Sequence, residues 1–408
     1  MIQRLSGVVD AILTERPGAQ EVRVTVDPPL PTSCQPAPFA NVGGQGNQPA
    51  TRDQPPAATR YALNLVALSG RVAVGSRVLL NTLAVEMGLG TGGLDFVITQ
   101  MEPDQARTPP PGHIVKLRYT PLQTPVLSVE APESPHHQAL CDFPGLEELP
   151  VVCTELHSQL PAICAAAHWS ARVQACPRQP RVVYVMTDGA ALPMALSRII
   201  PELKQRGWLQ ATITAGQSFG GDYEAVNLYS ALAAAKAACQ ADIIVAGPGP
   251  GAVGTATPLG FSGVDQGLAV NAAASLGGIS IVAPRISFAD KRSRHSGLSH
   301  HTVTVLQKIA RAAAYVAMPR LPEEQRIALE QCLQMPGSEE RHEAVYIDAA
   351  HGLQALIDSG MDVNTMGRSL NEERPFFLAA AAAGLLASQF AEAKIQGYEH
   401  KFDPAAWE

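Results

Sequence analysis

The sequence predicts an α/β protein in which a doubly wound, mainly parallel sheet carries helices on both faces and follows a small β-barrel-like N-terminal domain. Two observations lead to this prediction. Short runs with frequent polar and apolar alternation fill the first 150 residues, whereas from residue 151 apolar runs of strand length alternate with helical, often alanine-rich stretches. The chain has 408 residues, so we expect one domain at residues 1–150 and a Rossmann-like α/β domain at residues 151–408.

The N-terminal domain is predicted from six short strands separated by Gly and Pro turns. These strands are expected at residues 21–26, 61–68, 71–80, 94–100, 113–119 and 125–130. Six short strands in one segment are typical of a small barrel or sandwich. Residues 27–60 are rich in Pro, Gly, Gln and Ala and hold few large apolar residues, so we interpret them as an insertion outside the core.

Seven apolar runs predict the strands of the second domain. They lie at residues 151–153, 182–186, 211–214, 242–246, 279–283, 314–317 and 344–347, and helical patterns such as residues 225–239 and 303–313 alternate with them. Parallel strands that are buried on both faces have continuous apolar sequences, and right-handed crossovers cover both faces with helices. Ligands bind such sheets outside the carboxyl ends of the strands, so the residues after each strand are the candidates for a site.

Composition and charge exclude several classes of protein. The formal net charge is -7, which argues against a protein that binds polyanions through its whole surface. The seven cysteines form no C-x-x-C pair and so indicate neither a disulfide framework nor a zinc site. The longest apolar run, residues 376–390, is shorter than the roughly 20 residues that cross a bilayer, and the N-terminus has no continuous apolar region of a signal peptide. We therefore expect a cytoplasmic protein without membrane contacts.

A glycine loop follows the predicted strand at residues 242–246. Gly249, Gly251 and Gly254 form a literal G-x-G-x-x-G, with Thr255 next to it, and such glycines let the backbone approach a pyrophosphate. However, prolines within the loop supply no N–H, and no acidic residue follows the next strand to hold a ribose hydroxyl. Arg285 stands there instead, which would suit the 2′-phosphate of NADP. We favour a loop whose glycines permit tight turns and keep an NADP-dependent oxidoreductase as an alternative.

The longest polar segment of the second domain, residues 285–302, directly follows the strand at residues 279–283. It contains Arg285, Lys291, Arg292, Arg294, His295, His300 and His301. Ser299 is predicted to cap a helix that begins near His300. Guanidinium groups and the positive end of a helix dipole both favour an anion, so the segment predicts a phosphate or carboxylate pocket. Neutral imidazoles there could accept a proton, donate a hydrogen bond or bind a metal.

Two simpler interpretations of this segment remain open. It could be a surface loop whose cations pair with Asp290, Asp188 or Asp222, because runs of charge usually form solvated faces. It could also contribute to a metal site, for which Asp188, Asp222, Asp290 and His300 are suitable ligand types, although they come from different loops. Residues 88–93, which are rich in glycine, are interpreted as a flexible connection between strands.

The motifs after the strands also resemble those of a known family. Ser287-Phe288-Ala289-Asp290, the residues from Arg292 to Thr302, and the upstream Gly247-Pro248-Gly249 and Val253-Gly254-Thr255 resemble an uncharacterised bacterial family known only as domain of unknown function 3866. Leu80-Asn81-Thr82 and residues 88–93 resemble the N-terminal part of that family. The likeness covers most of the chain outside residues 27–60. It implies no activity, so the function has to be argued from the site.

We expect the second domain to bind a small anionic metabolite, for example a phosphorylated one, between residues 247–255 and residues 285–302. The binding candidates are Gly249, Gly251, Gly254, Thr255, Arg285, Arg292 and Arg294. If the protein is an enzyme, His295 or His300 would be the acid or base and Asp290 would orient an imidazole.

Other functions would use other features of the chain. A non-catalytic ligand sensor or interaction module would use the same pocket. Nucleic-acid binding by the N-terminal domain is not favoured, because its strands lack interleaved aromatic and basic residues. The sequence identifies no cofactor and no metal, and it leaves the formation of a homo-oligomer open.

Overall fold

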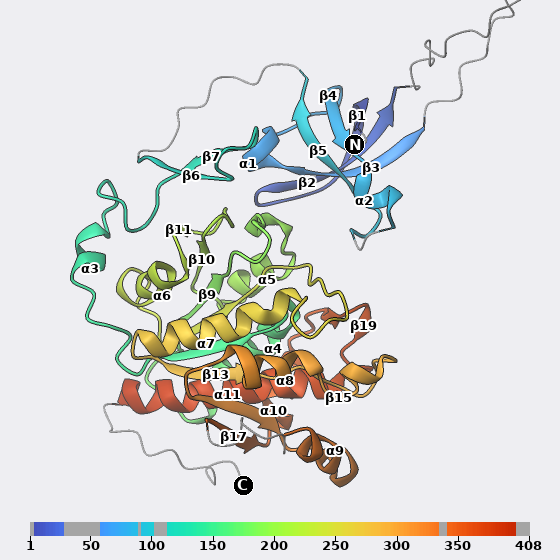
Figure 1. Ribbon diagram of the computed structural model, residues 1–408. Coiled ribbons are helices and arrows are strands. Elements are labelled where there is room, and N and C mark those ends of the chain that lie inside the picture. The colour runs from blue at the N-terminus through green and yellow to red at the C-terminus, as the bar shows by residue number, and fades with distance from the viewer. Residues whose placement is uncertain (1–3, 28–57, 89–90, 102–111, 334–340, 397–408) are drawn as a thin grey trace, which may run out of the picture. The chain divides into compact units, whose positions relative to one another are not determined.

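The computed structural model describes residues 4–27, 58–88, 91–101, 112–333 and 341–396 (Figure 1). Most of the predicted insertion at residues 27–60 lies outside these described residues. The chain divides into two compact units, Met1–Arg107 and Thr108–Glu408. The division falls earlier than the boundary near residue 150 that we expected from the sequence. Two strands that we assigned to the N-terminal domain, β6 (Ile114–Lys116) and β7 (Thr124–Val126), therefore belong to the second unit.

Lys116 explains why this hairpin belongs to the α/β unit. Its side chain is buried, and its ammonium group donates hydrogen bonds to three backbone carbonyls, those of Thr214 at 3.3 Å and of Ser218 and Ala225 at 3.0 Å. The carboxylate of Glu224 lies 3.3 Å from the same nitrogen. Burial lowers the pKa of Lys116 and raises that of Glu224. A buried charge needs such partners, and here β10, β11 and the loop between them supply them.

The first unit is a closed five-stranded barrel, which confirms the predicted barrel-like domain. Its strands are β1 (Arg4–Arg16), β2 (Ala19–Val26), β3 (Thr59–Leu65), β4 (Arg77–Asn81) and β5 (Asp95–Gln100), in the order β1-β2-β3-β5-β4, and two short helices, α1 (Val66–Ser69) and α2 (Leu83–Glu86), accompany them. β1 pairs with both β2 and β4 and so closes the barrel. The core consists mainly of valines, including Val9, Val22 and Val78.

The sequence did not predict β1, although it is the longest strand described. The pairing register between β1 and β2 shifts between Val9 and Ala11 and again between Ile12 and Thr14. Each irregularity adds a residue that faces the wrong side, so the regular alternation that marks a strand in the sequence is interrupted.

The second unit contains an eight-stranded sheet in the order β11-β10-β9-β12-β8-β13-β16-β17, and every pairing in it is parallel. Its strands are β8 (Pro150–Thr154), β9 (Val182–Met186), β10 (Ala211–Ala215), β11 (Tyr223–Ala225), β12 (Ile243–Gly247), β13 (Ile279–Ala283), β16 (Ala314–Pro319) and β17 (His342–Ile347). All seven predicted strands of this domain are present, and the short edge strand β11 is an addition. From β8 the chain passes through β9 and β10 to β11 at one edge, returns to β12 beside β8, and then passes through β13 and β16 to β17 at the other edge, as in a doubly wound sheet.

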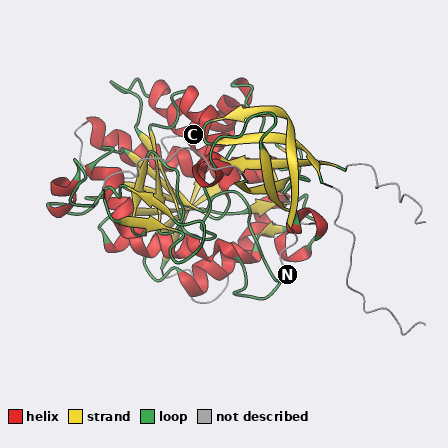
Figure 2. Cartoon of the chain, turned by 90° about the horizontal axis from the view of Figure 1, so that it is seen from above, coloured by secondary structure: helices red, strands yellow, loops and turns green. Residues whose placement is uncertain are grey.

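Helices cover both faces of this sheet, as Figure 2 shows. One face packs against α4 (Leu160–Val173), α5 (Ile199–Gln205), α10 (Ala350–Asp358) and α11 (Arg374–Gln396). The other packs against α6 (Leu228–Ala237), α7 (Asp265–Ser275) and the helical turns of α8 (His300–Thr304) and Val305–Ile309. Peripheral elements are α3 (His137–Cys141), α9 (Glu323–Leu333) and the two-residue strands β14 (Ile286–Ser287), β15 (Gly297–Leu298), β18 (Asn364–Thr365) and β19 (Arg368–Ser369). The fold class predicted from the sequence is confirmed.

The alanine-rich segment at residues 376–390 forms most of α11. By length and composition, Arg374–Ala393 could cross a membrane, but 89% of its most apolar window is buried inside the protein, as in the core helix of a globular fold. Its small residues permit a close approach to α4, because a Cβ on Gly384 would collide with the backbone carbonyl of Ile163. The helix is apolar on all sides because it packs against other helices and the sheet.

The three central strands β12, β8 and β13 are neighbours, and the strand order reverses around them. After β8 the chain passes to β9 on one side, and after β12 it passes to β13 on the other. Three connections therefore leave the carboxyl edge of the sheet at one place, beginning after Thr154, Gly247 and Ala283. This is the position where doubly wound sheets bind ligands.

Candidate functional site

Three imidazoles meet at this carboxyl edge, and we call His295, His300 and His301 the histidine cluster. The ring centroids lie 4.9 Å apart for His295 and His300, 4.8 Å for His295 and His301, and 4.4 Å for His300 and His301. One ring nitrogen from each lies within 4.8 Å of the others. His295 is buried and the other two are half-buried. The structure thus brings together the histidines that the sequence places in one polar segment.

Short local elements hold the cluster in position. β14 and β15 pair at Ile286 and Leu298, so the segment after β13 folds back on itself. Ser299 caps α8 as predicted: its Oγ accepts from the backbone N–H of His301 at 3.2 Å. The same Oγ lies 2.8 Å from Nδ1 of His295. One serine therefore fixes the start of the helix and the ring of a histidine four residues before it.

A buried carboxylate and an aromatic ring orient His301. Oε1 of Glu155 lies 2.8 Å from Nδ1 of His301, and an ionised carboxylate can only accept, so Nδ1 donates and Nε2 carries the lone pair. The ring of Phe261 stacks on His301 with centroids 3.8 Å apart and planes at 5°. Gly254 pairs with Phe261 in an isolated bridge, and a Cβ on this glycine would lie 3.7 Å from Cε1 of His301. The end of the glycine loop therefore packs on the cluster.

Glu155 and Arg285 form an ion pair beneath the cluster. Nη1 of Arg285 lies 3.1 Å from Oε1 of Glu155, and the side chains are only 5% and 1% exposed. Burial would raise the pKa of Glu155, but the hydrogen bond from His301 and the charge of Arg285 outweigh it and hold the pKa below its ordinary value. Nη2 of Arg285 lies 3.6 Å from Oδ2 of Asp290 and has no hydrogen-bond partner among the described residues.

Asp290 contacts arginines in the structure. It accepts from Nε of Arg292 at 2.9 Å and from Nη2 of Arg292 at 2.6 Å, and Nη2 of Arg368 lies 3.5 Å away. The hydrogen bonds from Arg292 hold the pKa of Asp290 far below its usual range. We expected Asp290 to orient an imidazole, but the carboxylate that contacts an imidazole of the cluster is that of Glu155.

The two predicted acid–base histidines are neutral at pH 7. Burial lowers the pKa of His295 to about 3, with the charges of Arg285 and Arg292 adding to the effect. Burial, followed by the charge of His301, also lowers the pKa of His300. Nε2 of His300 is buried and has no hydrogen-bond partner within the described part of the chain. Nε of Arg294 donates to Nε2 of His295 at 3.4 Å, so that nitrogen accepts and Nδ1 donates to Ser299.

Of the four arginines around the cluster, three are paired with carboxylates. Arg285 pairs with Glu155, Arg292 with Asp290 and Arg368 with Glu373. Arg294 is exposed, and among the residues that the structure describes it has no carboxylate partner. Its guanidinium is therefore the positive group at the cluster that is available for a ligand.

The glycine loop forms turns and does not begin a helix. Gly249 lies where a Cβ would approach Sδ of Met186 at 2.8 Å, and Gly251 has a φ of 102°. Beyond Gly254, the N–H of Thr255 donates to the carbonyl of Gly260 at 2.8 Å, closing a hairpin-like turn. The dinucleotide fingerprint requires a helix N-terminus directly after the glycines. Here α7 begins only at Asp265, so this requirement is not met.

The other carboxylates proposed for a metal site form bonds elsewhere. Oδ1 of Asp188 accepts from the backbone N–H of Ser218 at 3.1 Å. Asp222 directly precedes β11 and accepts from the N–H of Thr212, next to the amino end of β10, and from Lys204. β11 runs parallel to β10, so the connecting loop returns to the amino edge of the sheet before Asp222. Among the residues that the structure describes, the group that could ligate a metal consists of the three histidines.

Sequence reasoning did not identify Glu155 or Phe261. Glu155 directly follows β8, the first strand of the eight-stranded sheet along the chain. The rule that site residues follow the carboxyl ends of strands would therefore have identified it. Phe261 lies beyond the glycines at the end of the loop that follows β12, and no sequence motif marks it. Its role depends on the turn that brings it onto His301.

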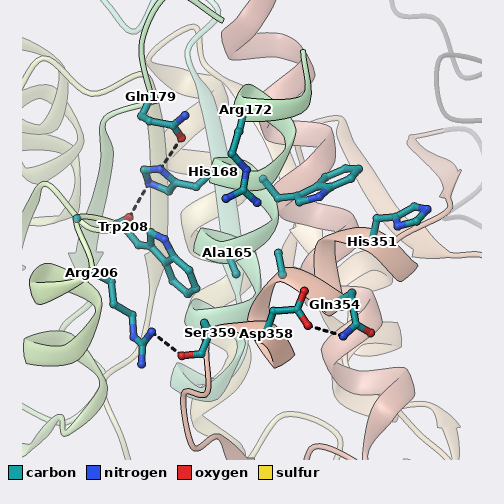
Figure 3. A pocket seen from close by; sticks show the side chains of 13 residues that line it. Ala165, His168, Arg172, Gln179, Arg206, Trp208, His351, Gln354, Asp358 and Ser359 are labelled. Carbon is teal, nitrogen blue, oxygen red and sulfur yellow. Dashed lines mark hydrogen bonds between the residues drawn. The ribbon is translucent and has the colours of Figure 1, made fainter. Parts of the chain in front are cut away.

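A cavity of about 730 Å³ lies elsewhere, and we call it the tryptophan pocket (Figure 3). It is lined by Ala165, His168, Trp169, Arg172, Gln179, Arg206, Gly207, Trp208, His351, Gln354, Ala355, Asp358 and Ser359. Gln179 precedes β9 and Trp208 precedes β10, so the pocket lies at the amino edge of the sheet. It is therefore at the opposite edge from the histidine cluster.

Comparison with known proteins gives a family and no activity. Neither a curated protein nor a solved structure matches the chain. A family model described as "Protein of unknown function (DUF3866)" matches residues 61–384, which include β4, β5 and most of β3 of the barrel, but not β1 or β2, and all the residues of the histidine cluster. Because this match spans well over half of the 408 residues, the chain belongs to the DUF3866 family.

Proposed function

We propose that the protein binds a small anionic metabolite, for example a phosphorylated one, at the histidine cluster. The observation that carries the proposal is the position of Arg294, an exposed guanidinium without a described carboxylate partner, next to three clustered imidazoles. Guanidinium groups bind phosphate and carboxylate through paired, charge-assisted hydrogen bonds. The cluster lies outside the carboxyl ends of β12, β8 and β13, where the strand order reverses, which is the usual ligand position in such sheets.

The local charge supports an anion rather than a cationic metabolite. Around the cluster, three arginines are balanced by the three carboxylates with which they form ion pairs, and Arg294 remains as an unbalanced positive charge. The whole chain has a formal charge of -7, so this region has the opposite sign to the rest. A single small anion fits such a local charge better than an extended polyanion does.

A chemical step at this site would use an imidazole. With no metal bound, His301 is the best-placed base, because Glu155 accepts from its Nδ1 and leaves the lone pair on Nε2. A sensor that binds the same anion without turnover would use the same residues. Measured turnover of a bound metabolite therefore separates an enzyme from a sensor.

The NADP alternative receives less support from the site. Arg285, which we considered for a 2′-phosphate, is buried and paired with Glu155. The glycine loop is followed by a turn, and α7 begins at Asp265, whose carboxylate would repel a pyrophosphate. We therefore propose an anionic ligand without a dinucleotide part.

The proposed compartment is the cytoplasm. Cys153 and Cys164 are free thiols in the buried core of the α/β unit, as is usual in a reducing environment. Burial raises the pKa of both thiols, so they are packing residues and not nucleophiles.

Isothermal titration with inorganic phosphate and a panel of phosphorylated and carboxylated metabolites tests the function. Hydrogen bonds to charged groups contribute about 1.5 to 3 kcal/mol, so Arg294→Ala should weaken the affinity roughly 10- to 100-fold. Arg172→Ala is the matched control, because Arg172 is an exposed arginine of the tryptophan pocket at the opposite edge. Equal affinity of wild type and Arg294→Ala for any bound anion, or no anion bound at all, would refute the proposal.

A further inference from the structure

We infer that His295, His300 and His301 are the ligands of a divalent transition-metal ion, for which zinc is the fitting occupant, and that the bound anion completes its coordination. The metal site is argued from the cluster itself. Only the statement about the anion rests on the proposed function.

The composition of the cluster fits a metal that prefers imidazole. Three histidines with an open fourth position are the ligand set of catalytic zinc sites, and imidazole also suits other first-row transition metals. One nitrogen of each ring lies within 4.8 Å of the others. Tetrahedral zinc with bonds of about 2.0–2.1 Å needs ligand nitrogens roughly 3.4 Å apart, so the rings must close by at most about 1.4 Å when the ion binds.

The lone pairs of the cluster are available. Nδ1 of His301 donates to Glu155, and Nδ1 of His295 donates to Ser299, so both rings keep an Nε2 lone pair. Nε2 of His300 is buried without a partner among the described residues. An unpaired buried nitrogen is costly, so it indicates a partner that binds there. In each of the three rings, Nε2 is thus the atom left for an ion.

The contacts behind the rings also match those of metal sites. Metal-ligating histidines commonly donate their other ring nitrogen to a carboxylate or another oxygen, which fixes the tautomer and the ring orientation. Glu155 does this for His301 and is itself held by Arg285. Ser299 does it for His295, and Phe261 fixes the plane of the His301 ring. These contacts pre-orient two of the three ligands in the protein chain alone.

The ion would link the metal site to the anion. Arg294 contacts Nε2 of His295 at 3.4 Å, a long hydrogen bond on an exposed side chain, so an ion at this nitrogen displaces the guanidinium. The displaced guanidinium remains beside the open coordination position. A doubly charged ion and a guanidinium together favour a ligand with at least one negatively charged oxygen. Phosphate or carboxylate groups have this chemistry.

Zinc titration of the full-length protein, after treatment with a chelator, tests the metal site. We expect one zinc per chain, and with Co²⁺ we expect the visible absorption of a tetrahedral site. His300→Ala should abolish both signals. This variant is suitable because the ring is half-buried and its Nε2 supports no described hydrogen bond. His351→Ala, which removes an exposed histidine from the tryptophan pocket, should bind zinc like the wild type.

A second variant measures the contact behind the ring. Glu155→Gln keeps the size of the side chain but removes its charge, and loss of such an oriented carboxylate typically lowers metal affinity about 10- to 100-fold. A circular dichroism spectrum equal to that of the wild type shows that the variant is folded. Unchanged zinc affinity in this folded variant would contradict the role that we assign to Glu155.

The outcomes separate the two proposals. If the wild type binds neither zinc nor Co²⁺, or if His300→Ala binds them equally well, the metal inference is wrong. If phosphate then still binds and depends on Arg294, the proposed function stands without a metal. If zinc binds at the histidines but neither phosphate nor any metabolite of the panel binds the zinc-loaded protein, the metal site stands and the proposed function fails.

Discussion

The α/β unit has two candidate regions at opposite edges of one sheet, and they differ in how completely their polar groups are satisfied. The tryptophan pocket is a cavity of about 730 Å³, but several of its side chains contact one another. His351 stacks on Trp169 with centroids 5.6 Å apart, and Arg206 lies 5.6 Å from the ring of Trp208. His168 bonds through both ring nitrogens, to Gln179 and to the carbonyl of Trp208, as Figure 3 shows.

The histidine cluster has the opposite character. Nε2 of His300 and Nη2 of Arg285 are buried without described hydrogen-bond partners, and among the described residues no such atom belongs to the tryptophan pocket. Buried polar atoms are nearly always paired in folded proteins, so an unpaired one indicates a missing partner. We therefore base the proposed site on the unpaired polar atoms at the topological switch point and not on the volume of a cavity.

The largest expected difference between the two regions concerns the removal of an arginine. Arg285→Met would leave the carboxylate of Glu155 buried without its cation, and breaking a buried pair typically costs about 3 to 5 kcal/mol. Arg206→Met should cost only about 1 kcal/mol, because the ion pair of Arg206 with Glu202 is partly exposed. Urea unfolding of both variants measures the difference. Equal losses of stability would show that the carboxyl edge is not the more tightly coupled region.

The carboxyl edge should also contribute to the pH dependence of stability. His157 lies two residues after Glu155, 2.7 Å from Oγ of Ser197 and 3.1 Å from the hydroxyl of Tyr184, and burial lowers its pKa from 6.5 to about 4. Below pH 6.5 the unfolded chain binds a proton that the folded chain does not accept until about pH 4. The folded state should therefore lose stability across this range, by up to about 3 kcal/mol from this group.

Unfolding measurements at several pH values check this expectation. His157→Gln should flatten the decline between pH 6.5 and 4, whatever its effect at pH 7. His351→Gln, at the exposed rim of the tryptophan pocket, is the control and should leave the slope unchanged. A slope for His157→Gln that equals the wild-type slope would show that His157 does not stay neutral in the fold.

The smallest expected effect is that of a substitution in the tryptophan pocket. It tests whether the ligands bind at the carboxyl edge of the sheet or at the amino edge. Trp208→Leu should leave the affinities for phosphate and zinc unchanged, because Trp208 lies at the amino edge of the sheet. Titration of each ligand into this variant and into Arg294→Ala compares the two edges directly. A loss of phosphate binding in Trp208→Leu that exceeds the loss in Arg294→Ala would move the ligand to the tryptophan pocket.

The sequence predicts the fold of the α/β unit well because its signals are local. Each buried parallel strand is a continuous apolar run, and each is followed by glycine or charge at the carboxyl edge. The strand β1 and the domain boundary were harder to predict. Two register shifts interrupt the alternation in β1, and the assignment of the β6–β7 hairpin depends on Lys116, which reaches carbonyls about 100 residues further along the chain.

The candidate site could be predicted in part for the same reason. His295, His300 and His301 lie within seven residues, so one polar segment contains them all. Their partners come from separate strands and turns: Glu155 follows β8, and Phe261 is brought onto His301 by the turn after Gly254. The tertiary structure decides which side chains contact the histidines. Sequence spacing alone therefore suggested Asp290, the nearest carboxylate in the chain, although Asp290 binds Arg292 instead.

A crystal structure of the full chain grown with zinc and phosphate would show directly whether both bind at the histidine cluster. We expect an anomalous zinc peak within bonding distance, about 2.0–2.1 Å, of Nε2 of His295, His300 and His301. Phosphate is expected at the open coordination position, within hydrogen-bonding distance of Arg294. A zinc or phosphate peak at the tryptophan pocket, with the histidine cluster empty, would contradict both the proposed metal site and the proposed anion site.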